Sequence, residues 1–108
     1  MADSADRVFA AVASPARRRL LGLLLERGPL PVRDLAAHFA MRRPSVSEHL
    51  RVLRDAGLVS ERKAGRQRYY RLEPQPLQEL SRWLSPYERL GQDKLPGWGD
   101  PLDSGGED

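Results

Sequence analysis

The spacing of apolar residues predicts four helices in the first part of the chain. Apolar positions recur every three or four residues, the period of an amphipathic helix, in four stretches that follow polar or proline residues. These stretches cover residues 4–13, 15–27, 32–39 and 43–56. Because Leu30 stands between two prolines, any strand between the second and third helices is expected to be very short.

The fourth predicted helix and the turn before it divide into core and surface positions. Met41 is the apolar member of the short turn over residues 40–42, and we expect it to be tucked inward. Val46, Leu50 and Leu53 fall on one face at helical spacing and are predicted to belong to the core. The opposite face is polar, so it is expected to meet solvent or a ligand.

The second half of the chain predicts a hairpin and one further helix. Residues 58–62 and 67–72 have the composition of strands, and the segment between them, Lys63-Ala64-Gly65-Arg66, makes a basic tip. Apolar residues from Leu77 onward recur at helical spacing, and Pro86 is expected to kink or restart that helix. Residues 91–108 are rich in glycine, proline and acids, which predicts a disordered acidic tail.

The composition narrows the class of protein. A chain of 108 residues allows one domain, which we place at residues 1–90. The absence of cysteine removes disulfides, thiolate nucleophiles and zinc sites with cysteine ligands. No glycine-rich phosphate loop or serine nucleophile motif is present, so we expect neither an enzyme nor a cofactor. Without a signal peptide or an apolar membrane span, the protein is expected to be soluble and cytoplasmic.

The net charge of +3 hides an uneven distribution. Residues 1–40 carry +2, residues 41–73 carry +5, and residues 74–108 carry −4. A basic middle segment is expected of a surface that binds phosphates, although a solvated arginine-rich face would have the same composition.

The order of the predicted elements indicates a fold class. Two helices joined by a tight turn form a helix-turn-helix, and a basic hairpin after it makes the winged version of that motif. We therefore predict a mainly α domain of about five helices with a two- or three-stranded wing. In this arrangement the helix near 43–56 fits the major groove of double-stranded DNA, while the wing near 63–68 reaches the backbone or the minor groove.

Four stretches carry a resemblance to a known family. They are SPARRRLLGLLLERGPLPVRDLAAHF (14–39), PSVSEHLRVLRDAGLVS (44–60), ERKAGRQRYYRLEP (61–74) and PLQELSRWLSPYERL (76–90). Together they resemble the ArsR/SmtB family of winged-helix transcriptional regulators over roughly residues 5–90. The resemblance implies a homodimeric repressor that binds a palindromic operator and dimerises through its first and last helices. The apolar residues expected at that interface are Phe9, Val12, Leu77, Leu80, Trp83 and Leu84.

The resemblance does not extend to metal sensing. Metal-sensing members place cysteines in the helix before the recognition helix, or carboxylates and histidines along the last helix. This chain has Val32-Arg33-Asp34-Leu35-Ala36 and Leu77-Gln78-Glu79-Leu80-Ser81-Arg82 at those places. Neither run can assemble three or four ligands, and we assign the two histidines to different helices. We therefore expect no metal, and the chain resembles the family members that lack a metal site.

The candidate DNA contacts divide by role. Arginine, serine and glutamate side chains can all bond base edges, and arginine and lysine also bind phosphates. The candidates near bases are Arg43, Ser45, Ser47 and Glu48. The candidates near phosphates are Arg42, Arg51, Lys63, Arg66 and Arg68, with Gln67 as a further polar contact. Arg42 stands where the family usually has a small polar capping residue, so we expect a weak cap there.

Each assignment has a plainer alternative. The two serines could satisfy backbone groups, and Glu48 could offset Arg51 or Arg42. Arg51 could form an intramolecular pair, and the run Arg17-Arg18-Arg19 is interpreted as a solvated helix edge. For the whole chain, the alternatives are a winged-helix module that binds proteins and not DNA, or a sensor with an unrecognised ligand or metal site.

Overall fold

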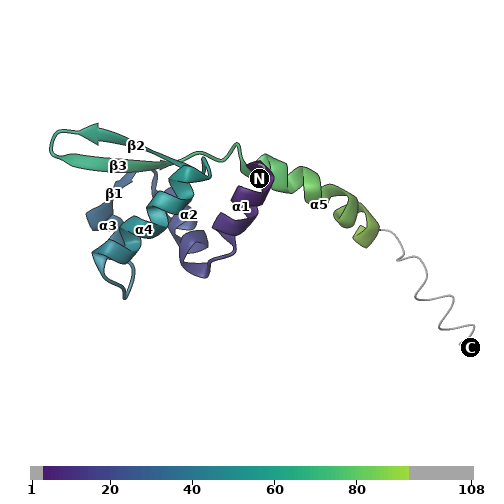
Figure 1. The fold of residues 1–108 in the computed structure, drawn as a ribbon, viewed down its shortest axis with the longest axis horizontal. Coiled ribbons are helices and arrows are strands. Elements are labelled where there is room, and N and C mark those ends of the chain that lie inside the picture. Colours follow the sequence, from purple (N-terminus) through teal and green to yellow (C-terminus); the bar gives the residue numbers. More distant parts are fainter. Residues whose placement is uncertain (1–3, 93–108) are drawn as a thin grey trace, which may run out of the picture.

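The computed structural model of the chain describes residues 4–92, which form five helices and a three-stranded antiparallel sheet (Figure 1). In chain order the elements are α1 (Ser4–Val12), α2 (Pro15–Arg27), β1 (Leu30–Pro31), α3 (Val32–Ala36), α4 (Arg43–Asp55), β2 (Val59–Ala64), β3 (Gln67–Leu72) and α5 (Leu77–Gln92). The predicted fold class is confirmed. Apart from the last helical positions, Gly91 and Gln92, the predicted acidic tail lies outside the described residues.

The core lies where α2, α3 and α4 pack together beneath the sheet. Val46, Leu50 and Leu53 of α4 are fully buried, as their spacing predicted. Leu35 of α3 and Leu20 of α2 join the same apolar cluster. Met41 is half-buried and packs against this cluster, so its predicted inward position is also confirmed. With its apolar face committed to the core, α4 turns a polar face outward.

The sheet has the strand order β1-β3-β2, with both neighbouring pairs antiparallel. The short strand predicted at Leu30 pairs with Tyr70, and the hairpin closes where Ala64 pairs with Gln67. The two residues between them form the turn, and Gly65 has a φ of 65°. Among positions 4–92 only glycines have a positive φ, so the φ of Arg66, the second turn residue, is negative. A positive φ at the first turn residue alone is the pattern of a type II′ turn.

The third helix is shorter than the sequence predicts. Periodicity placed it at residues 32–39, but α3 ends at Ala36 and the chain continues in tighter turns. The N–H of Phe39 donates to Ala36 O at 3.1 Å, three residues back instead of four. Arg19 of α2 donates to His38 O at 3.0 Å and lies 4.9 Å from the centre of the Phe39 ring. These tertiary contacts favour the turn over another helical turn, and they place His38 outside the helix that we predicted for it.

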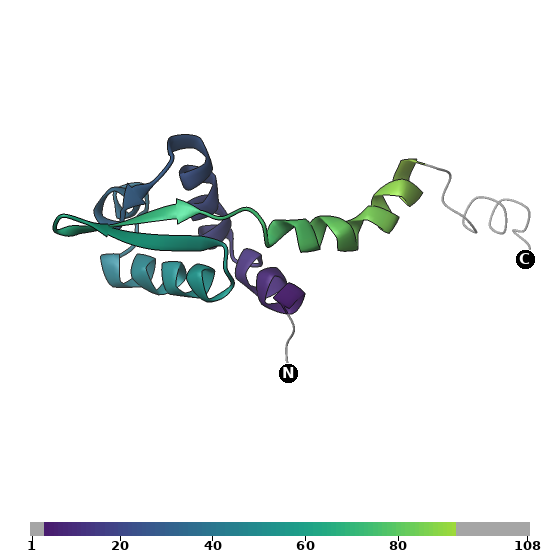
Figure 2. The ribbon, with the colours of Figure 1, turned by 90° about the horizontal axis from the view of Figure 1, so that it is seen from above.

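The last helix projects from the rest of the fold (Figures 1 and 2). Pro86 lies inside α5, which continues through it as one element. Figure 2 shows the helix axis changing direction in its C-terminal half, as expected for a helix that contains proline. Within residues 4–92, no helix is both long and apolar enough to cross a membrane.

Candidate nucleic-acid interface

The N-terminal end of α4 presents unpaired polar side chains. Arg42 precedes the helix in an extended conformation (φ −72°, ψ 151°), and its side chain makes no capping hydrogen bond, as expected. Arg42, Arg43, Ser45 and Ser47 are all exposed. Within residues 4–92, none of the four side chains has a hydrogen bond or ion pair, so the two serine hydroxyls do not satisfy backbone groups. This end of α4 is therefore free to contact a partner.

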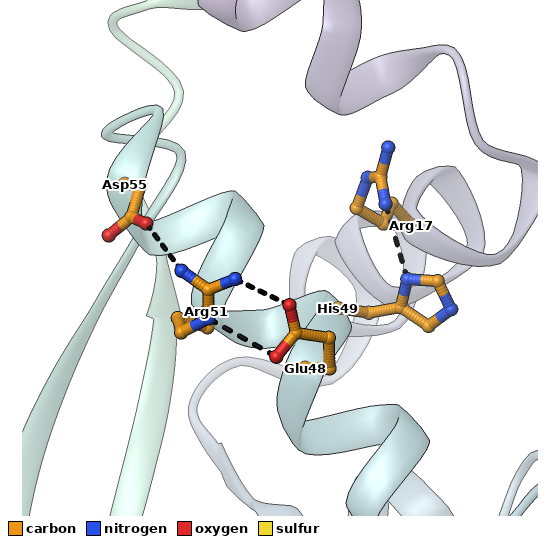
Figure 3. Close-up of polar contacts among 5 residues, drawn as sticks. All are labelled: Arg17, Glu48, His49, Arg51 and Asp55. Carbon is orange, nitrogen blue, oxygen red and sulfur yellow. Dashed lines mark hydrogen bonds and ion pairs between the residues drawn. The ribbon is translucent and has the colours of Figure 1, made fainter.

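Further along the exposed face of α4, two charged side chains are paired with each other (Figure 3). Arg51 donates from Nε to Glu48 Oε1 at 3.2 Å and from Nη2 to Oε2. It also donates to Asp55 Oδ2 at 3.1 Å. The hydrogen bond from Arg51 lowers the pKa of Glu48, and the same bond raises the pKa of Arg51. The intramolecular pair that the sequence left open is thus present, and Glu48 and Arg51 differ from the free residues at the start of the helix.

Glu61 of β2 ties the wing to α4. Its carboxylate accepts from Arg54 of α4 at 3.0 Å and from Arg68 of β3 at 2.9 Å. Hydrogen bonding with the nearby Tyr70 hydroxyl contributes most to a lowered Glu61 pKa, and the two arginines add to the effect. Burial and this carboxylate raise the pKa of Tyr70. Arg68, a predicted phosphate contact, is therefore held by a carboxylate within the protein.

The remaining predicted residues of the wing lie near its tip. Lys63 and Arg66 are exposed and have no ion pair within residues 4–92. Gln67 is half-buried at the start of β3. The tip therefore carries two free cations beyond the Glu61 network.

A cleft of about 550 Å³ brings the start of α4 together with the wing. Its polar lining comes from Arg43 of α4, Arg66, Gln67 and Arg68 of the hairpin, and Arg33 of α3, while Pro31 and Val32 complete the wall. The lining contains four arginines and no acidic residue. Such a concave, positively charged surface suits the phosphates of a nucleic-acid backbone.

Arg33 is the member of this cleft that the sequence did not single out. It lies in the first turn of α3, and its only ion pair within residues 4–92 is a loose one of 3.8 Å to the adjacent Asp34. Pro31, two residues earlier, pairs with Tyr69 of β3 and so brings the start of α3 beside the wing. No local sequence pattern predicts the pairing of β1 with β3. The only sequence signal for Arg33 was a basic residue at the start of a predicted helix.

In the run Arg17-Arg18-Arg19, Arg18 and Arg19 are exposed, as expected of a solvated helix edge, whereas Arg17 is half-buried. Arg17 donates to Ala11 O at 2.7 Å and to Ala10 O at 3.1 Å. Arg18 donates to Val12 O at 2.7 Å, and Arg19 holds the turn after α3. All three guanidinium groups therefore bind backbone carbonyls of neighbouring elements. A run of charge gives no sign of this, because the acceptors are main-chain oxygens that every residue has.

The predicted dimer residues lie on α1 and α5. The Phe9 ring meets the Trp83 ring edge to face with centroids 5.3 Å apart, and Tyr87 lies 4.8 Å beyond Trp83. Val12, Leu77 and Leu80 are half-buried against the core. By contrast, the other large apolar residues of α5 are exposed in the single chain; they are Trp83, Leu84, Tyr87 and Leu90. The outer part of α5 thus shows an apolar face that this chain does not cover.

Potential metal ligands are dispersed in the structure. Across positions 4–92, no three His, Asp or Glu side chains gather as a metal site. His38 lies in the turn after α3, where its Nδ1 is 3.0 Å from Asp34 O, and His49 lies in α4.

The fold is that of a winged helix-turn-helix protein, because a short connection joins α3 to α4 and the basic hairpin of β2 and β3 follows them. The particular family follows from comparison with known proteins. Residues 14–61 match the model of the bacterial regulatory protein arsR family. The HTH-type transcriptional regulator Rv2034 of Mycobacterium tuberculosis is 40% identical over 97% of this chain and 94% of its own length. The chain therefore belongs to the ArsR family of transcriptional regulators, as its sequence indicated.

A further sequence relative and two solved structures are similar to the chain. The transcriptional repressor SdpR of Bacillus subtilis is 34% identical over 83% of this chain and 99% of its own. The crystal structure of the ArsR family transcriptional regulator RHA00566 superposes with a TM-score of 0.73 at 35% identity, covering 87% of this chain and 99% of that one. The homodimeric winged helix-turn-helix DNA-binding domain of Mb0332 from Mycobacterium bovis gives a TM-score of 0.65 at 27% identity, covering 84% and 83%.

Proposed function

We propose that this regulator is a homodimeric repressor that binds a palindromic operator through α4 and the wing. The observation that carries the proposal is the acid-free cleft of four arginines between the start of α4 and the hairpin. Phosphate oxygens would replace water around these guanidinium groups with charge-assisted hydrogen bonds. A DNA strand lying along the cleft would bring the start of α4 to the major groove.

The free and the paired side chains take different roles in this proposal. Arg43, Ser45 and Ser47 are free at the end of α4 that would enter the groove, so they are the candidates for base contact. Arg42, Lys63, Arg66 and Gln67 would contact the backbone or the minor groove. Arg68 would add its charge to the cleft while Glu61 holds it in place. Glu48 would reach a cytosine amino group only by giving up its bonds to Arg51.

Dimerisation would cover the apolar face of α5. Phe9, Trp83 and Leu84, with the half-buried Val12, Leu77 and Leu80, would meet their counterparts in a second chain. The homodimeric domain of Mb0332 supports this arrangement, and the name of SdpR supports repression. Two α4 helices related by a two-fold axis would read half-sites about 34–36 Å apart.

A protein-binding module is the rival function. Its recognition surface would normally offer aromatic or aliphatic anchors. The exposed start of α4 offers arginines and serines instead, and the large exposed apolar side chains lie on α2 and α5. The surface that a winged helix turns toward DNA therefore has the composition of a nucleic-acid contact.

Operator selection from random DNA duplexes, followed by titration at several salt concentrations, tests the proposal. The purified protein is expected to enrich a palindrome and to bind it more weakly as salt rises. Arg66→Ala is expected to flatten the salt dependence by about one ion. Arg43→Ala is expected to cost about 1–3 kcal/mol, concentrated at one base pair of each half-site. If no duplex is enriched and no DNA is bound even at low salt, the repressor function is wrong.

A further inference from the structure

Arg17 joins three helices at one point. It lies in the first turn of α2, and its Nε and Nη2 donate to Ala11 O at 2.7 Å and Ala10 O at 3.1 Å, in the last turn of α1. Its Nη1 lies 3.3 Å from Nδ1 of His49 in the middle of α4. Since a guanidinium can only donate, the imidazole Nδ1 accepts in this contact. Figure 3 shows the two side chains pointing toward each other between α2 and α4.

Apart from Arg17, helices α1 and α4 have few direct contacts with each other. α1 packs on α2 and α5, whereas α4 packs on α2, α3 and β2. Between α1 and α4 lies a cleft of about 560 Å³, with Ala10 and Ala11 on one wall and Val52 and Ala56 on the other. Arg17 lines this cleft and contacts both walls. Both helices also pack on α2, and Ala11 of α1 belongs to the buried core, so Arg17 adds a polar link across the cleft to this apolar packing.

The chemistry of arginine suits this position. The carbonyls in the last turn of a helix have no intrahelical partner and carry the negative end of the helix dipole, so a cation binds there favourably. The planar fork of the guanidinium offers separate donors to two carbonyls and to the imidazole at once. A lysine ammonium is a single point charge and cannot hold all three acceptors in this fixed geometry.

We propose that Arg17 and His49 are positioning residues that transmit the geometry of the dimer to the recognition helix. The inference rests on the proposed function, in which α1 and α5 form the dimer interface and α4 enters the major groove. With α1 held at the dimer axis, the bond to His49 sets where α4 lies relative to that axis. The pair thereby determines the distance between the two recognition helices and the half-site spacing that the dimer accepts.

The neighbouring Arg18 provides a matched control. It also binds the end of α1, through Val12 O at 2.7 Å, but it makes no hydrogen bond to α4. Arg18→Met removes one arginine and one bond to α1, while Arg17→Met removes the bonds to α1 and the bond to α4. His49→Leu removes only the bond to α4 and leaves Arg17 on the α1 carbonyls. The three variants separate stabilisation of α1 from the link between α1 and α4.

The first test measures the distance between the recognition helices without DNA. Because the chain has no cysteine, Ser47→Cys on the exposed face of α4 creates one spin-labelling site per protomer. In the labelled dimer, electron-spin distance measurement should give a narrow distribution that Arg18→Met leaves unchanged. Arg17→Met and His49→Leu should each broaden or shift it. If both variants keep the parental distribution, the inference is wrong.

The second test measures spacing selectivity on the chain without the label. Operators with one base pair added or removed between the half-sites are compared with the selected operator. Arg17→Met and His49→Leu should lower the preference for the selected spacing by about three- to tenfold, and Arg18→Met should not. A spacing preference that neither variant changes contradicts the inference. If Arg17→Met fails to fold in thermal melting, His49→Leu decides both tests alone.

The two tests also separate this inference from the proposed function. A labelled chain without any dipolar signal is a monomer, which contradicts the homodimer and the inference together. A dimer that binds no duplex contradicts operator recognition, yet the distance measurement still decides whether Arg17 and His49 position α4.

Discussion

At the scale of single residues, the arginines divide into those held by protein acceptors and those facing solvent. Arg51, Arg54 and Arg68 are bound by carboxylates on α4 and β2. Arg43 and Arg66 have no partner within residues 4–92. A free guanidinium meets a phosphate without first breaking an ion pair, so these residues are expected to contribute more to DNA affinity than their paired neighbours.

Arg33 allows a direct test of the arginine cleft. Arg33→Ala is expected to weaken binding to all DNA sequences alike and to reduce the slope of log affinity against log salt by about one, because it would remove a proposed phosphate contact and no base contact. The slope is measured by fluorescence anisotropy between low and physiological salt. Arg27→Ala removes an exposed arginine that does not line the cleft, and it should leave the slope unchanged. Equal slopes for wild type and Arg33→Ala would place Arg33 outside the DNA contact.

The lowered pKa of Glu61 predicts how the free energy of unfolding depends on pH. The Tyr70 hydroxyl, Arg54 and Arg68 lower its folded-state pKa below the ordinary value of 4.5. A lowered carboxyl pKa contributes stability that is present above the unfolded-state pKa and is lost as pH falls through the folded-state pKa. The wild type is therefore expected to be more stable than Glu61→Gln at neutral pH, and the difference should shrink in acid below about pH 4.5.

Urea unfolding at neutral pH and at several acidic pH values measures this difference. Glu26→Gln, which replaces an exposed carboxylate without an ion pair within residues 4–92, is the control for general effects of charge removal. A difference between wild type and Glu61→Gln that stays constant across the acidic range would show that the Glu61 carboxylate is not coupled to folding.

At the scale of elements, the end of α4 depends on one glycine. Gly57 has a φ of 79°, a left-handed conformation that side chains rarely adopt. A Cβ placed there would lie 3.4 Å from Pro76 Cγ, just before α5. The glycine therefore allows α4 to stop and the chain to turn into β2 close to the start of the last helix. This connection sets the wing against the recognition helix.

Two glycine substitutions should have opposite effects on stability. Gly57→Ala is expected to lower the free energy of unfolding by about 1–2 kcal/mol, because alanine is strained at positive φ. Gly22→Ala, inside α2 with no atom near the new methyl group, is expected to raise it by up to about 1 kcal/mol. Denaturant unfolding of both variants measures the two changes. Stabilisation by Gly57→Ala would mean that the turn takes another conformation.

At the scale of the whole molecule, most of the large exposed apolar side chains of residues 4–92 lie on α5, the helix that projects from the fold (Figure 2). Trp83 is 52% exposed although its ring contacts Phe9 and Tyr87. Aromatic side chains in this position are strong anchors in protein interfaces. Together with Leu84, Trp83 forms the exposed apolar part of the proposed dimer interface, opposite in character to the arginine cleft.

Removing the Trp83 side chain should dissociate the proposed dimer. Trp83→Ala is expected to weaken self-association by about 2 kcal/mol or more, roughly thirtyfold. Operator affinity should fall with it, because two separate protomers no longer bind the two half-sites as one linked unit. Sedimentation equilibrium measures the association constant. Leu25→Ser is the control, since Leu25 is a 73% exposed apolar residue on α2, outside this face. Wild-type association in Trp83→Ala would contradict the interface.

The sequence by itself determined the features that depend on neighbours along the chain. The apolar spacing of Val46, Leu50 and Leu53 predicted a buried face of α4 that the structure confirms. Strand composition on both sides of Gly65 predicted the hairpin and its basic tip. Periodicity, turn chemistry and charge are local properties, and the order of the resulting elements was enough to predict the fold class.

Tertiary structure decided everything that depends on residues far apart in the chain. The end of α3 at Ala36, where Arg19 holds the turn, departs from a periodicity that continued to Phe39. The start of α3 reaches the wing through the pairing of β1 with β3, which adds Arg33 to the cleft. Likewise, only packing brings Arg17 within reach of His49. A guanidinium acquires its role from the acceptors that folding places around it, and no local sequence pattern specifies those distances.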